Sequence, residues 1–277
     1  MWLAALGVSA VIAISVAVAV PATNVPVPAP ASVPTGHSDG LSDQHGGYRL
    51  EPVSLPQERG DAVPVAFRIL GPDGAPATGY ADVATMPLHL YAVREDLTGY
   101  QHLHPRLVGD TWRTALRVPD GGVYRLYAEF TPAHLVAYGQ PIVLGTRFII
   151  TADTNQVTLP AASATTTVDR FTVNRLDGMP TLPSGVATVL RFQVLDAGGP
   201  VASLEPYLGT FAHLSGFDVP TQALTHVHPA MAPNAAAPRD GTLAFHTVFH
   251  HPGPQRLFLQ FQVAGTVHLA AFTVVVS

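Results

Sequence analysis

The chain has 277 residues, which suits one large domain or two domains of ordinary size. Hydrophobic residues make up 47% and charged residues 12% of the sequence, the net charge is −5, and all 14 basic residues are scattered arginines, so we expect no nucleic-acid partner. Because the sequence has no cysteine, disulfides, thiolate nucleophiles, iron–sulfur clusters and Cys-type zinc sites are excluded, and we do not expect a blue-copper centre.

The N-terminal segment favours export. Residues 2–20 are uncharged and almost wholly apolar, and a helix of about 19 residues can just cross a bilayer. Small residues near positions 17–22 also suit cleavage of a secretory signal. We therefore expect residues 1–22 to form an apolar helix that is a signal peptide or a membrane anchor. The protein would be secreted or in the cell envelope, and the membrane would be a partner only if residues 2–20 stay uncleaved.

The remaining sequence predicts a tether followed by two β-domains. Residues 23–47 are rich in Pro, Gly and Ser, which is typical of a flexible tether. From residue 48 onward, short β-branched and aromatic runs alternate with Gly/Pro turns, which is the pattern of all-β sandwiches. The second half repeats the first, so we predict two tandem Ig-like β-sandwich domains. Their predicted bounds are 48–153 and 167–277, with a linker at 154–166.

A three-histidine frame occurs once in each half. A histidine is followed thirteen residues later by a His-x-His-Pro element, at residues 88–105 and again at 212–229. Alternate residues of a strand share one face, and the turn-like residues 94–99 predict a hairpin that brings the first and third histidines opposite each other. Each copy is therefore predicted to gather three imidazoles on one face. The six histidines are His89, His102, His104, His213, His226 and His228.

Three converging imidazoles suit copper, zinc or nickel, and they leave one coordination position open. His246 and His268, on predicted strands of the second domain, are possible additional ligands. The alternative is that the imidazoles brace each hairpin by hydrogen bonding to backbone carbonyls. A duplicated domain duplicates every feature, so the repeated spacing alone does not decide between the two.

The chain resembles exported bacterial proteins, common in actinobacteria, that carry two YtkA-like, Ig-like domains. The resemblance covers about residues 48–277 and is carried by residues 88–105, 204–217, 224–229, 245–249 and 256–276, with the His-x-His-Pro elements as its most specific part. It implies a β-sandwich fold, export and an association with copper or another heavy metal. The second hairpin is more polar than the family pattern and contains Pro220, which predicts a looser hairpin there.

These observations favour a non-enzymatic envelope protein that binds or hands over copper or zinc, with an envelope protein as a possible partner. The alternative is an extracellular adhesion or partner-binding module in which the histidines are structural. We do not expect an enzyme, because the sequence has no Gly-x-Ser-x-Gly elbow, no Gly-rich phosphate loop and no carboxylate placed as a base within either frame. Metal binding needs neutral imidazoles, so we expect it to weaken below about pH 6.5.

Overall fold

The computed structural model describes residues 38–138, 141–231 and 236–277. Within these residues the chain is built of β-strands, and a 3₁₀ turn, η1, lies at Ala133–Tyr138. The predicted all-β class with tandem sandwiches is therefore confirmed. The predicted apolar N-terminal helix lies outside the described residues. Among the residues that are described, no helix has the length and apolar character needed to cross a membrane.

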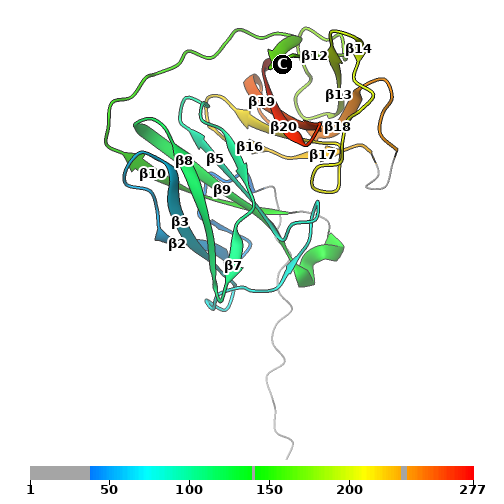
Figure 1. The fold of residues 1–277 in the computed structure, drawn as a ribbon. Helices are drawn as coiled ribbons and strands as arrows, with labels where there is room; N and C mark the ends of the chain where they lie inside the picture. The colour runs from blue at the N-terminus through cyan, green and yellow to red at the C-terminus, as the bar shows by residue number, and fades with distance from the viewer. Residues whose placement is uncertain (1–37, 139–140, 232–235) are drawn as a thin grey trace, which may run out of the picture. The chain divides into compact units, whose positions relative to one another are not determined.

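The first sandwich consists of two antiparallel sheets, drawn from blue to green in Figure 1. One sheet has the strand order β1-β2-β3-β8-β7; the other has the order β10-β9-β5-β6, and β4 pairs with β9. The strands are β1 (Gln44–His45), β2 (Tyr48–Ser54), β3 (Gly60–Leu70), β4 (Tyr80–Ala81), β5 (Leu88–Arg94), β6 (Gln101–Leu103), β7 (Arg106–Val108), β8 (Thr111–Val118), β9 (Gly122–Pro132) and β10 (Ile142–Ile150).

The second sandwich repeats this topology. Its sheets have the orders β11-β12-β13-β18-β17 and β16-β15-β19-β20, and β14 pairs with β13. The strands are β11 (Thr165–Val168), β12 (Phe171–Arg175), β13 (Ala187–Asp196), β14 (Gly199–Pro200), β15 (Ala212–Asp218), β16 (Leu224–Thr225), β17 (Val227–Pro229), β18 (Thr242–Val248), β19 (Gly253–Val263) and β20 (Thr266–Val276). The first two histidines of each frame thus lie on or next to equivalent strand pairs, β5–β6 and β15–β16.

Each sandwich has its own apolar core. The alternation predicted from the sequence is clear in β13, where the inward residues are buried and most of the intervening residues are partly or fully exposed. Fully buried aromatic rings fill both cores, among them Phe67 and Trp112 in the first and Phe192 and Phe245 in the second. Burying each such ring contributes roughly 1.5–3 kcal/mol.

Strand β5 is buried on both faces, because the second sandwich covers the face that does not point into its own core. Leu88 and Leu90 belong to the core of the first sandwich, whereas Tyr91 belongs to a separate apolar cluster. The ring of Tyr100 stacks on that of Phe258 in this cluster, with centres 4.2 Å apart. We call this cluster the interdomain cluster; its buried members are Tyr91, Val93, Leu97, Tyr100, Tyr127 and Val143 of the first sandwich and Phe217, Leu224 and Phe258 of the second.

Residues 38–47 pack against the sandwiches, so the prediction of a tether is wrong for this part of residues 23–47. Ser38 is buried, and its hydroxyl accepts a hydrogen bond from the Val143 amide at 2.7 Å. The Gly145 amide donates to the Ser42 carbonyl, and a Cβ at Gly145 would lie 1.8 Å from the Gly40 carbonyl oxygen. Only glycine fits beside this segment, whose high Gly and Ser content is used for close backbone contact.

Candidate metal centre

The first histidine frame is assembled by the hairpin of β5 and β6. Their register pairs Leu90 with Leu103 and Tyr91 with His102, so His104, one residue beyond β6, lies opposite His89. The ligand atoms of His89, His102 and His104 all lie within 4.8 Å of one another. The structure therefore brings the three rings together as the spacing predicts; that they bind a metal stays a prediction.

Hydrogen bonds fix which nitrogen of each ring is available. Nε2 of His89 donates to the Val83 carbonyl at 2.8 Å, so in a neutral ring Nδ1 carries the lone pair. That Nδ1 lies 2.9 Å from Nε2 of His102, whose own Nδ1 lies 2.8 Å from Oε1 of Gln260 in the second sandwich. Nε2 of His104 is buried, and no hydrogen-bond partner occurs for it among the described residues.

Burial and the charges of neighbouring imidazoles favour the neutral forms of His102 and His104. Burial lowers the pKa of His102 well below its ordinary value, and neighbouring imidazoles lower it further. The pKa of His104 falls to about 4 for the same two reasons, burial first and then the charges on His89 and His213. Neutral imidazole is the form that binds metals, so the lowered pKa values extend the ligand form below the pH of about 6.5 expected from an ordinary histidine.

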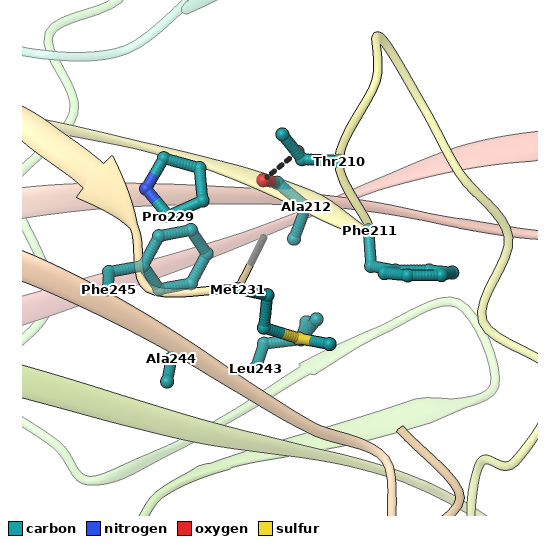
Figure 2. Close-up of a pocket in the computed structure, with 8 residues that line it drawn as sticks. All are labelled: Thr210, Phe211, Ala212, Pro229, Met231, Leu243, Ala244 and Phe245. Carbon is teal, nitrogen blue, oxygen red and sulfur yellow. Dashed lines mark hydrogen bonds between the residues drawn. The ribbon is translucent and has the colours of Figure 1, made fainter. Parts of the chain in front are cut away.

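A hollow gives access to the first frame. His104, Met86 and Trp112 line a space of about 680 Å³ on the first sandwich. The equivalent place in the second sandwich, between the start of β15 and the end of β17, has room for about 10 Å³. Figure 2 shows that apolar side chains, Met231 and Phe245 among them, gather there. Among the described residues, the hollow beside His104 is therefore much larger than its counterpart beside Pro229 in the second sandwich.

The second frame does not gather its rings, and the prediction that it does is wrong for the described residues. The β15–β16 ladder ends at Thr225, and the chain then crosses to the opposite sheet, where β17 pairs with β18. His228 consequently lies exposed on β17, next to His246 on β18. The strand exchange separates His228 from His213, because the two now belong to different sheets.

His226, at the crossing point, forms a charged pair with the first sandwich. Its Nδ1 lies 3.2 Å from Oε1 of Glu129, and its Nε2 donates to the Ser38 carbonyl at 3.2 Å. Burial disfavours the charged ring, but the hydrogen bond and charge of Glu129 outweigh burial and raise the pKa of His226. Burial likewise opposes ionisation of Glu129, yet His226, His89 and Tyr91 together lower the pKa of Glu129 to about 2. Both nitrogens of His226 are therefore used in holding the two sandwiches together.

The remaining candidate ligands of the second sandwich have separate positions. Nδ1 of His268 lies 2.6 Å from Oδ2 of Asp169, and its ring packs against Phe171 and Phe261. Neither His246 nor His268 belongs to a group of converging ligands in the part of the chain that the structure describes.

His213 of the second sandwich lies beside the first frame, a position that the sequence did not predict. Its ring centre is 5.5 Å from that of His102 and 6.3 Å from that of His89. Nε2 of His213 donates to the Tyr207 carbonyl at 3.0 Å, as His89 does to Val83. The one sequence signal for this docking is the apolar character of both faces of β5, which indicates a strand covered on each side.

Comparisons with known proteins define a family but no activity. The model of the family described as "Domain of unknown function (DUF8832)" matches residues 44–143 and 166–277, more than half of the chain and both sandwiches. No curated protein matches the sequence. The match leaves the resemblance to YtkA-like proteins untested, so that resemblance stays a prediction.

The solved structures that resemble this chain have low sequence identities and low TM-scores. The filamin domain of Lin-41 is 14% identical over 42% of this chain and 96% of its own, with a TM-score of 0.28. The Escherichia coli adhesin FdeC is 15% identical over 83% of this chain and 64% of its own, with a TM-score of 0.26. Domains 4 and 5 of the S-layer protein SbsC are 8% identical over 83% and 96% of the two chains, with a TM-score of 0.24.

Proposed function

We propose that this chain, which belongs to the DUF8832 family, binds a copper or zinc ion through His89, His102 and His104. The observation that carries the proposal is the buried, unpartnered Nε2 of His104, on a ring whose ligand atom lies within 4.8 Å of those of two other imidazoles. A buried polar atom without a partner costs about 1–3 kcal/mol, and a bound metal ion would remove that cost.

The ring geometry supports a tetrahedral or trigonal ion. Metal–nitrogen bonds of about 2.0–2.1 Å place the centres of tetrahedrally arranged imidazoles about 5 Å apart. The ring centres of His89 and His102 are 5.1 Å apart, those of His89 and His104 5.1 Å, and those of His102 and His104 4.7 Å. All three separations match the expected value to within a few tenths of an ångström.

The positions of the ring protons of His89 and His102 also favour a bound cation. Nε2 of His89 donates to the Val83 carbonyl, and Oε1 of Gln260 accepts a hydrogen bond from Nδ1 of His102. Two neutral rings with these donors direct their lone pairs at each other across 2.9 Å. A metal ion that accepts both lone pairs would satisfy them once the two nitrogens separate to roughly 3.3 Å, the distance that tetrahedral bonds of about 2.0–2.1 Å require. Val83 and Gln260 would then orient the rings from behind, as outer-shell partners of metal-bound histidines do.

We propose a binding and transfer role in the cell envelope rather than catalysis. Glu129, the carboxylate beside His89, is engaged by His226 and Tyr91, so its geometry suits structure rather than proton transfer. The hollow next to His104 would let a metal donor or acceptor protein reach the ion.

The test is metal content and affinity with a matched pair of variants. Wild-type protein should bind one Cu or Zn ion per chain, and His104→Gln should weaken binding at least about 100-fold, because the loss of an outer-shell partner alone costs roughly 10–100-fold. His228→Gln changes the equivalent but exposed histidine of the second sandwich and should bind like wild type. Unchanged binding in a folded His104→Gln protein, or no binding by wild type, would contradict the proposal and favour histidines that only brace the hairpin.

A further inference from the structure

We infer that His213 is the fourth ligand of this ion, so that the bound metal joins the two sandwiches. The inference rests on the proposed metal binding by His89, His102 and His104. It adds a ligand from the second sandwich. The ion would then connect the two sandwiches instead of being held by the first sandwich alone.

His213 and His89 are structural equivalents with the same orientation constraint. His89 is paired with Glu129 across β5 and β9, and His213 is paired with Gln260 across β15 and β19. Each donates from Nε2 to a backbone carbonyl six residues earlier in the chain. In both neutral rings the lone pair is therefore on Nδ1, the atom that His89 directs at the frame.

His213 lies beside two of the three rings of the site. Its ring centre lies 5.5 Å from that of His102 and 6.3 Å from that of His89, compared with about 5 Å for a tetrahedral set. Movements of roughly 0.5 Å and 1.3 Å towards these two rings close the differences, which is within the side-chain adjustment that partners make on binding.

Gln260 of the second sandwich connects His213 to the first histidine frame. The residue that pairs with His213 across the sheet is the same one whose side chain contacts His102. Strand β19 therefore sets both the fourth ring and the outer-shell contact of the second ring. A change in the docking of the sandwiches would displace both together, so metal affinity and docking are coupled reciprocally.

The experiment is nitrogen-detected NMR of the histidine rings in the full chain, with zinc alone as the probe. Coordination changes the ¹⁵N shift of the nitrogen that binds. We expect zinc to shift Nδ1 of His89 and His213 and Nε2 of His102 and His104, while His226 and His228 keep their signals. His213→Gln should still bind one zinc ion, with an affinity lower by at least about 10-fold, the smallest loss expected even for an outer-shell partner.

The outcomes separate this inference from the proposal beneath it. Shifts at His89, His102 and His104 without a shift at His213, and with unchanged affinity in His213→Gln, would overturn the fourth ligand and leave the three-histidine site. No zinc-dependent shift at any of the four rings would overturn both. His268→Gln, a second-sandwich histidine held by Asp169, is the matched control and should bind zinc like wild type.

Discussion

In the first sandwich, β6 continues through Leu103 before the chain crosses to the opposite sheet, whereas in the second β16 ends at Thr225. The histidine spacing is identical in both, and the strand registers agree when extended along each hairpin. The earlier crossing changes the result: His104 stays across from His89, but His228 moves to a different sheet from His213. Identical spacing therefore produces one gathered frame and one divided frame, depending on where a strand changes sheets.

The sandwiches dock so that equivalent histidines meet equivalent residues of the other domain. His102 contacts Gln260, and its equivalent His226 contacts Glu129, which occupies the position in β9 that Gln260 has in β19. Burial lowers the pKa of His102 although the contact with Gln260 raises it, whereas the Glu129 carboxylate helps to raise the pKa of His226 despite burial. One Glu/Gln difference thus separates a proposed ligand from a charged interdomain contact.

The largest effect should come from Tyr100, because its ring fills the interdomain cluster and its hydroxyl bonds to Ser215 at 2.9 Å. We expect Tyr100→Ala to lower the free energy of unfolding by about 3–5 kcal/mol, as other buried aromatic-to-Ala changes do. Tyr100→Leu introduces the residue type of its second-sandwich equivalent, Leu224, and should lower the free energy of unfolding by less than Tyr100→Ala.

Urea denaturation in the presence of a chelator measures this effect. Val108→Ala, at a side chain that is 58% exposed, serves as the control and should change stability by less than about 0.5 kcal/mol. If Tyr100→Ala costs no more than this control, the stacked ring does not stabilise the docked sandwiches.

A smaller effect is expected from Glu129→Gln, which makes the two halves of the interface alike. Because the pKa of Glu129 is lowered from 4.5 to about 2, the stability that it contributes is present above pH 4.5 and lost as pH falls towards 2. The pKa of His226 is raised from 6.5, so its contribution is present below pH 6.5 and lost as pH rises through the raised value.

The difference in stability between wild type and Glu129→Gln should therefore be largest between pH 4.5 and 6.5. We expect about 1–3 kcal/mol there, the range for hydrogen bonds to charged groups. Denaturation of metal-free protein at several pH values measures it. At pH 3, roughly half of the stability contributed by the Glu129 charge should be lost. If the stability difference between wild type and Glu129→Gln is the same at pH 3 as between pH 4.5 and 6.5, the ion pair does not stabilise this contact.

Local sequence predicted the strands and the first frame, because a hairpin register depends on residues close in the chain. The alternation in β13 and the spacing of His89 and His102 were sufficient for this. The second frame could not be predicted in the same way, because the end of β16 depends on pairing of β17 with β18. The approach of His213 to His89 depends on docking between sandwiches, for which hydrophobic periodicity gives no register.

The smallest effect should follow Gln260→Leu, which removes the outer-shell contact of His102 and leaves the proposed ligands in place. We expect metal affinity to fall about 10-fold, the low end of the range for outer-shell changes, because Val83 still orients His89. Gln260→Glu keeps an acceptor at the position and introduces the residue type of its equivalent in the first sandwich, Glu129, so it should retain metal affinity at neutral pH.

Competition titration with a zinc chelator compares the metal affinities of wild type and these two variants. Equal affinity in Gln260→Leu and wild type would remove Gln260 from the metal centre, and the Glu/Gln difference would then matter only through the ion pair of Glu129 and His226.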